Sequence, residues 1–125
     1  MRYIFIALAL LLFFSTCFAQ DSNNEMRTEI RHLFGYLKNS GCEFNRNGKW
    51  YNAEEAVKHI DKKYQYLIKK GLVNSTEQFI DRAASESSMS GKPYLVRCGD
   101  AEPAKCSVWF KSELARYRKK TFLIK

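Results

Sequence analysis

The sequence predicts a small α+β domain in which about four helices pack on a small antiparallel sheet, formed by a hairpin plus one further strand. Helices are indicated because apolar residues recur at three- and four-residue steps in several segments. The hairpin is indicated by an Asn-Gly pair between two short runs, since this pair best tolerates the backbone of a type I′ turn. The further strand is indicated by a run whose residues alternate as they do in a sheet.

The first segment of the chain is typical of a secretory signal peptide. Arg2 is followed by the apolar run 3–14, which is too short to span a bilayer well, and the small residue Ala19 precedes a polar stretch. We therefore expect a signal peptide over residues 1–19, cleavage after Ala19, and a single α+β domain over residues 20–125. No other run is long or apolar enough to span a membrane, so we predict an exported, soluble protein.

The first helix and the hairpin of the domain follow one another directly. A helical apolar stripe over residues 22–40 ends at Gly41, which can adopt the left-handed conformation of a helix cap. Residues 42–51 then form two short strands around Asn47-Gly48. Strands this short require helices or a third strand to pack against.

Three more helices and one strand complete the predicted domain. Asn52, with Glu55 three positions later, caps a helix that extends to about Lys70. A shorter helix starts after Asn74 or Ser75, and Ser107 caps the last one. The strand is predicted over residues 94–98 and the loop that follows it over residues 99–103.

The four cysteines divide into one in the leader and three in the domain. Cys17 raises the alternative of a lipoprotein, but Phe14-Ser15-Thr16 lacks the aliphatic and very small residues of a lipidation site, so we expect no acyl anchor. In an oxidising compartment two of the remaining cysteines pair. A Cys42–Cys98 bridge would stabilise the fold by roughly 4 kcal/mol and Cys98–Cys106 by about 2.5. We favour the longer bridge and retain the shorter one as the alternative.

The chain is basic, with a formal net charge of +8 at pH 7. A positive surface favours anionic partners such as lipid headgroups or acidic envelope polymers, although it is also typical of a solvated basic face. Export separates the protein from nucleic acid, so we expect no nucleic-acid partner. A basic end that could lie on anionic lipid comprises Arg116, Arg118, Lys119 and Lys120.

The segment 87–98, SSMSGKPYLVRC, is similar in composition to a phosphate loop and to a serine-nucleophile loop, but its residues match neither motif. A phosphate loop requires glycine where Glu86 stands, and Ser or Thr where Pro93 stands. A Ser-x-x-Lys nucleophile requires serine where Met89 stands, three residues before Lys92. We interpret the segment as a turn that leads from a helix into a strand.

One helix carries a polar stripe, in which Glu55, His59 and Lys63 are spaced four residues apart. The stripe is typical of a surface ion-pair row. The alternative is that Glu55 orients His59 towards a cleft closed by the serine-rich segment 87–98, where His59 binds a ligand or acts as a base. Neither His59 nor His32 lies at ligand spacing to a cysteine, so we predict no metal site and no cofactor.

Three stretches carry a family resemblance. They are RNGKWYNAEEAVKHIDKKY (46–64), STEQFIDRAASESSMSGKPYLV (75–96), and the last helix with Trp109, Leu114 and Arg118. Together they resemble the YfeK-like family of small, uncharacterised exported bacterial proteins, a domain of unknown function. The resemblance implies a Gram-negative periplasmic location and brings no established activity. It marks as motif positions Arg46, Asn47, Gly48, Glu55, His59, Ser88, Ser90, Gly91, Lys92 and Tyr94.

The reading we prefer is a monomeric, non-enzymatic periplasmic module that binds a protein or an anionic envelope component. No complete catalytic set is present, so no catalytic residue is assigned. The first alternative is an inhibitor or immunity protein whose loop blocks an envelope-directed enzyme. The second is a small hydrolase that uses His59 with Ser88 or Ser90. The candidate binding residues are Arg46, Asn47, Glu55, His59, Lys63, Ser88, Ser90, Lys92 and Tyr94.

Overall fold

The structure is a computed structural model that describes residues 15–124, with side chains from Ser22 onward. Residues 1–14, and with them most of the predicted signal peptide, lie outside the described residues. The elements along the chain are α2 (Ser15–Lys38), β1 (Glu43–Arg46), β2 (Lys49–Tyr51), α3 (Ala53–Lys69), α4 (Thr76–Ala83), β3 (Leu95–Arg97), β4 (Ala104–Lys105) and α5 (Cys106–Ile124).

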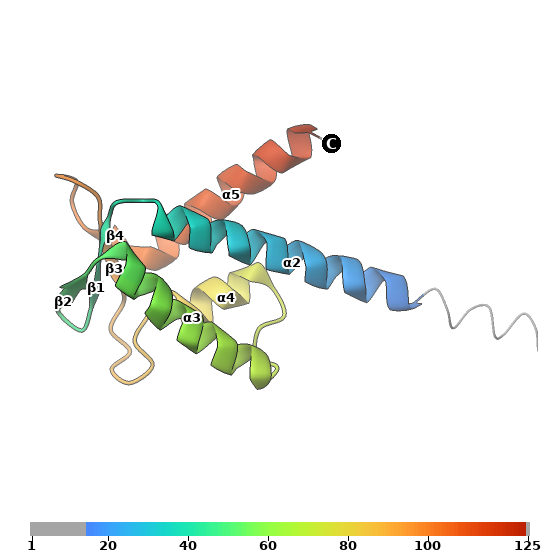
Figure 1. The fold of residues 1–125 in the computed structure, drawn as a ribbon, viewed down its shortest axis with the longest axis horizontal. Coiled ribbons are helices and arrows are strands. Elements are labelled where there is room, and N and C mark those ends of the chain that lie inside the picture. The colour runs from blue at the N-terminus through green and yellow to red at the C-terminus, as the bar shows by residue number, and fades with distance from the viewer. Residues whose placement is uncertain (1–14, 125) are drawn as a thin grey trace, which may run out of the picture.

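The strands lie together at one end of the molecule, and the helices extend away from them (Figure 1). The short helix α4 is central, because it contacts α2, α3 and α5. Its N-cap is Ser75, whose side chain accepts a hydrogen bond from the backbone of Gln78. Within the described part of the chain, no helix is both long and apolar enough to cross a membrane.

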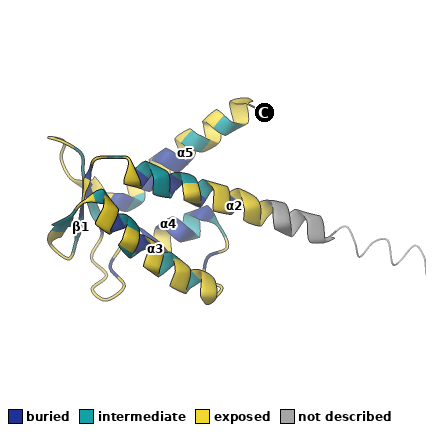
Figure 2. Ribbon diagram, in the orientation of Figure 1, coloured by how far each residue is buried: buried dark blue, intermediate teal, exposed yellow. Residues whose placement is uncertain are grey.

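The core forms where the inner stripes of the helices meet one face of the sheet. Burial follows these stripes, while the outer faces of the helices remain exposed (Figure 2). On α4 and its C-cap the four residues predicted to face inwards, Phe79, Ile80, Ala83 and Ala84, are all almost completely buried. The other buried apolar residues are Met26, Ile30, Leu33, Leu37, Cys42, Phe44, Ala56, Ile60, Val73, Tyr94, Val96, Cys106, Phe110 and Leu114.

The sheet is antiparallel, with the strand order β2-β1-β3-β4. Asn47 and Gly48 form the predicted turn, with φ angles of 53° and 83°. β3 pairs with β1 as predicted, and Phe44 lies opposite Val96. The α+β fold class is therefore confirmed, with one strand more than the sequence indicated.

Cys42 and Cys98 form the predicted disulfide across the β1–β3 pair. Glu43 and Arg97, the residues next to these cysteines, are register partners, and this pairing brings the two sulfurs within bonding reach. Cys106 remains a free thiol and is buried. The shorter Cys98–Cys106 alternative is therefore not the bond that forms.

Three boundaries differ from the prediction. α2 begins at Ser15 and continues across the predicted cleavage site, where the periodicity had placed its start at residue 22. β4 lies beyond the predicted loop 99–103; two exposed residues carry no alternation for a sequence pattern to detect. α5 begins at Cys106, so Ser107 lies inside its first turn and is not the N-cap that we predicted.

Candidate functional site

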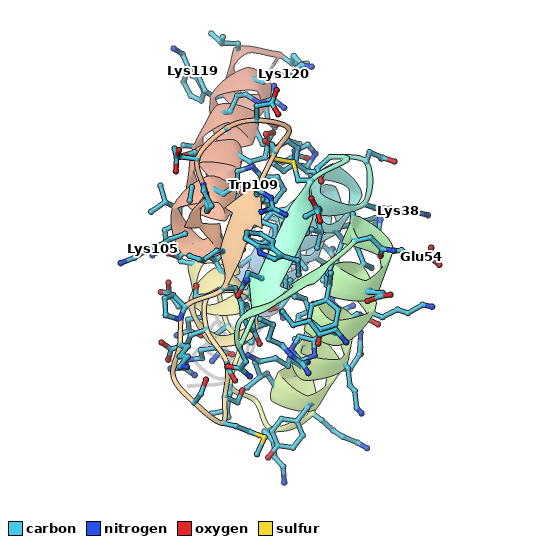
Figure 3. All side chains as sticks on the ribbon, turned by 90° about the vertical axis from the view of Figure 1, so that its left-hand side faces the viewer. Lys38, Glu54, Lys105, Trp109, Lys119 and Lys120 are labelled. Atoms are coloured by element: carbon cyan, nitrogen blue, oxygen red, sulfur yellow. A yellow bond between two sulfur atoms is a disulfide. The ribbon has the colours of Figure 1, made fainter. Side chains whose placement is uncertain are left out.

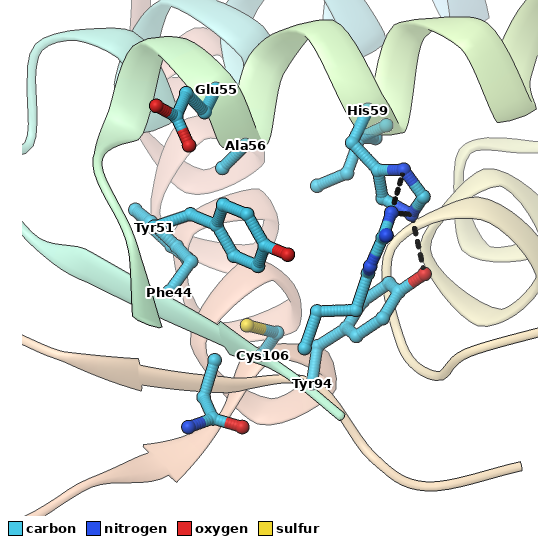
Figure 4. A pocket seen from close by; sticks show the side chains of 10 residues that line it. Phe44, Tyr51, Glu55, Ala56, His59, Tyr94 and Cys106 are labelled. Atoms are coloured by element: carbon cyan, nitrogen blue, oxygen red, sulfur yellow. Dashed lines mark hydrogen bonds between the residues drawn. The ribbon is translucent and has the colours of Figure 1, made fainter. Parts of the chain in front are cut away.

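Three segments that are distant in sequence meet at His59. His59 lies on α3, Arg46 ends β1, and Tyr94 directly precedes β3. The ring nitrogens of His59 lie 2.5 and 3.1 Å from Nη1 of Arg46, and Nε2 lies 2.9 Å from the Tyr94 hydroxyl (Figure 4). We name the group formed by Arg46, His59, Lys63 and Tyr94 the His59 cluster.

The protonation of His59 follows from its partners. A guanidinium group only donates hydrogen bonds, so the ring nitrogen that it contacts most closely, Nδ1, is assigned as an acceptor. Nε2 then carries the proton and donates to the oxygen of Tyr94. Burial, together with the charges of Arg46, Lys63 and Lys62, lowers the pKa of His59 from 6.5 to about 4. His59 is therefore neutral at pH 7.

Lys63 completes the cluster from the next turn of α3. Its ammonium group donates to the backbone oxygen of Glu86, at 2.7 Å, and to the Tyr94 hydroxyl, at 3.2 Å. It also lies 5.0 Å from the centre of the Tyr94 ring. Partial burial lowers the pKa of Lys63, although the carboxylate of Glu86 opposes the shift, and burial raises the pKa of Tyr94.

The serine loop, residues 86–93, is tied to the hairpin turn by a second set of hydrogen bonds. Asn47 donates to the Ser87 hydroxyl at 3.2 Å and accepts from the Ser90 hydroxyl at 2.5 Å. The loop closes on itself, because the amide of Ser87 donates to the backbone oxygen of Lys92 at 2.9 Å. Gly91 turns the chain there with a φ of 70°. The loop therefore has a defined place beside the His59 cluster.

A cavity of about 100 Å³ opens beside the His59 cluster, between β1, β2, α3 and the start of α5. Its wall is mostly apolar, and the thiol of Cys106 belongs to it. Burial raises the pKa of this thiol to about 12, so the thiol stays protonated and unreactive. The lining residues are Phe44, Asn45, Arg46, Tyr51, Glu55, Ala56, His59, Ile60, Tyr94 and Cys106.

Glu55 lines this cavity but does not orient His59. The hydrogen bonds that His59 makes within the described part of the chain go to Arg46 and Tyr94. Figure 4 shows the Glu55 carboxylate at the opposite side of the cavity from the imidazole. Among the described residues, the ion pair within this helix joins Glu54 to Lys58, and none joins Glu55, His59 and Lys63 to one another. The predicted stripe is therefore not a surface ion-pair row either. Helical spacing identified the stripe but could not identify partners that come from a strand and a loop.

The remaining candidate residues lie at the edge of the site. Ser88 and Lys92 are exposed, and Met89 between them is 97% exposed at the tip of the loop. His59 makes no hydrogen bond to Ser88 or Ser90 in the described structure. The alternative of a hydrolase that uses His59 with one of these serines stays a prediction. Ser87, which was not among the predicted binding residues, is buried and accepts a hydrogen bond from the side chain of Asn47. Neighbouring serines look alike in sequence, and only the fold distinguishes them.

The basic end of α5 is less free than its sequence indicated. Arg116 contacts the buried carboxylate of Glu113, and Arg118 contacts both Glu29 and Glu77. Lys119 and Lys120 project from the outer end of the helix (Figure 3). Among the described residues, no group of three His, Cys, Asp or Glu side chains could hold a metal ion.

Comparison with known proteins identifies the family of this chain. A family model described as a family of unknown function (DUF5329) matches residues 24–118. The chain belongs to this family. An uncharacterised relative from Salmonella typhimurium, YfeK, is 34% identical over 94 residues, which cover 75% of this chain and 77% of the relative. No solved structure matches.

Membership of the DUF5329 family confirms the resemblance found in the sequence. The matched range contains the whole His59 cluster, the serine loop and both cysteines of the disulfide. It ends at Arg118, before the outer turn of α5. The family description gives no activity, so a function for the site must come from its chemistry.

Proposed function

We propose that the protein is an exported, periplasmic, monomeric binding module without catalytic activity, and that it recognises its ligand at the His59 cluster and the adjoining serine loop. One observation carries the proposal: three segments bring polar side chains together in the wall of a mostly apolar cavity. Cavities of this kind, with few polar groups at defined positions, are typical of ligand sites. The leader over residues 1–19 supports export.

The chemistry of the cluster supports binding over catalysis. At pH 7 His59 is neutral, but the ring nitrogen that would serve as a base already accepts from Arg46. The Cys106 thiol stays protonated, so it offers no thiolate nucleophile. Arg46, Lys63 and Tyr94 supply donors, which hold a ligand in place rather than transform it.

The proposal can be tested by NMR, with the small-molecule fraction of a Gram-negative periplasmic extract added to the labelled protein. We expect amide resonances around Phe44, His59 and Tyr94 to shift in the wild type. The shifts should be lost in an Arg46→Met, Lys63→Met variant and retained in Lys58→Met, which changes an exposed lysine on the same helix. Shifts that persist unchanged in the double variant would contradict the proposed site.

The inhibitor or immunity alternative has its own support. Met89 at the tip of the serine loop is 97% exposed, and an exposed apolar tip on a tethered loop is suited to entering the cleft of another protein. Met89→Asp should then abolish capture of an envelope hydrolase from the protein fraction of the same extract, while the NMR shifts at the cavity persist. Equal capture by both forms would reject this alternative.

A further inference from the structure

The His59 cluster has more hydrogen-bond donors than the protein provides acceptors for. Arg46 has five N–H groups, and its closest hydrogen bond goes to His59. Tyr94 accepts from both His59 and Lys63, so its own hydroxyl proton is left to donate elsewhere. Lys63 has three protons, of which two are directed at Glu86 and Tyr94. The group therefore has N–H and O–H donors to spare, and none of its nitrogen or oxygen atoms is buried without a partner in the described structure.

Within the described structure the cations of the cluster have no carboxylate in direct contact, although the charge of Glu86 acts on Lys63. Among the described residues, no carboxylate oxygen lies within 4.0 Å of a side-chain nitrogen of Arg46 or Lys63. The contact of Lys63 with Glu86 is made to the backbone oxygen. The two cations repel each other and both lower the pKa of the imidazole between them. An anion at this point would offset both effects.

The cavity beside the cluster limits the size and polarity of what such an anion can carry. Apart from Arg46 and His59, most of its wall consists of aromatic, aliphatic and thiol groups. An apolar cavity of about 150 Å³ can hold a benzene molecule, so about 100 Å³ corresponds to a short branched aliphatic group. Glu55 lies at the far side of the cavity from His59, so its negative charge disfavours an anion there and favours the His59 side (Figure 4).

We infer that the site binds a small organic acid, whose carboxylate contacts Arg46, Lys63 and the Tyr94 hydroxyl and whose short apolar tail fills the cavity. This inference rests on the proposed function and specifies its ligand. An ionised carboxylate accepts hydrogen bonds with two oxygens and donates none, which matches a cluster that only needs acceptors. Its planar pair of oxygens can contact a guanidinium and an ammonium group at once.

The test uses isobutyrate as the probe and isobutyramide, which has the same shape without the charge, as the matched compound. We expect isobutyrate to give saturable shifts of the His59 ring and the Ala56 methyl group, and to bind about tenfold more tightly than isobutyramide. Acetate, which has the carboxylate without the tail, should bind more weakly than isobutyrate. Bound isobutyrate should also raise the pKa of His59 above about 4, because its charge offsets those of Arg46 and Lys63.

Two variants locate the two halves of the ligand. Lys63→Met should weaken isobutyrate binding about tenfold, whereas Lys62→Met, which removes the same charge from an exposed neighbour, should change it less than about twofold. Ala56→Leu fills the cavity and should abolish the advantage of isobutyrate over acetate. Circular dichroism and a thermal melt check that each variant is folded.

The outcomes separate this inference from the proposed function. If isobutyramide binds as tightly as isobutyrate, the carboxylate inference is wrong while the binding site stands. Equal weakening by Lys63→Met and Lys62→Met would show a general attraction to positive charge and would overturn the inference. If neither compound shifts the cavity resonances, the inference also fails, and the extract experiment alone then decides the proposed function.

Discussion

The two histidines of the chain lie on helices that pack together, yet their surroundings are opposite in charge. His32 on α2 lies 3.2 Å from the buried carboxylate of Glu113 and stacks on Tyr117, with 4.1 Å between ring centroids. His59 on α3 contacts Arg46 and Tyr94, with Lys63 beside them. We name the group formed by His32, Glu113, Arg116 and Tyr117 the Glu113 cluster.

The two clusters differ in whether the protein supplies both positive and negative groups in contact with each other. Glu113 is only 4% exposed, and its carboxylate is shared by two donors, Arg116 and His32. Its burial raises its pKa, but these hydrogen bonds outweigh burial and lower the pKa overall. The Glu113 cluster is thus complete within the protein. In the described structure the His59 cluster has two cations and no carboxylate in contact with them, and the proposed organic acid would supply that carboxylate.

The largest effect should come from the disulfide, which joins the residue before β1 to the residue after β3. Replacing both Cys42 and Cys98 by serine should lower the free energy of unfolding by about 4 kcal/mol, because the bridge closes a loop with a sequence separation of 56. Urea unfolding measures this loss. Since β1 ends at Arg46 and β3 directly follows Tyr94, the His59 pKa should also move towards 6.5, while the His32–Tyr117 stacking persists. If the His59 pKa moved and the His32–Tyr117 stacking was lost as well, the two clusters would not differ in their dependence on the disulfide.

A smaller effect should separate the clusters directly. Glu113→Gln should lower the free energy of unfolding by about 2 kcal/mol, because charge-assisted hydrogen bonds to a buried carboxylate are lost. Arg46→Met should cost less than about 1 kcal/mol, since it also relieves repulsion with Lys63. Thermal and urea melts measure both changes, with Glu54→Gln in an exposed ion pair as the control. A larger cost for Arg46→Met would assign it a structural role.

A further effect concerns pH. The pKa of His59 is about 4 in the folded protein and about 6.5 when unfolded, so the unfolded chain takes up the proton first. Stability that depends on neutral His59 is present above pH 6.5 and is lost as the pH falls towards 4. The ring faces Arg46, Lys62, Lys63 and Tyr94, with Glu86 beside Lys63.

His59→Gln should therefore flatten the loss of stability between pH 6.5 and 4, whereas His32→Gln should not reproduce that flattening. NMR titration of the His59 ring, combined with urea melts at pH 7 and 4.5, makes the measurement. A ring that titrates near 6.5 would show that neither burial nor the charges of Arg46 and Lys63 act on it.

Most of the fold could be predicted because local rules and packing agree in this chain. The Asn47-Gly48 turn, the Asn52 cap and the inner stripe of α4 each have a signal within a few residues. The features that sequence missed have no such signal. β4 consists of two exposed residues that pair with β3, and α2 starts at Ser15, outside the apolar stripe over residues 22–40.

The sequence predicted which residues form the candidate site, but it did not predict which of them contact one another. Arg46, His59, Lys63 and Tyr94 were all candidates, and the structure brings them together. Helical spacing paired His59 with Glu55, because a one-dimensional pattern relates only residues of the same helix. The guanidinium of Arg46 arrives from a strand, and the Cys106 thiol from the start of α5. Such neighbours follow from strand register and helix packing.

The burial of Cys106 bears on how the chain oxidises correctly. Cys98 and Cys106 lie eight positions apart, so in an unfolded chain they meet more often than Cys98 and Cys42 do. In the folded protein Cys106 is 1% exposed, and its amide donates to the backbone oxygen of Tyr94. Once the core has formed, the third thiol is withdrawn from exchange, and native pairing is protected by inaccessibility. The buried free thiol of Cys106 is thereby compatible with an oxidising compartment.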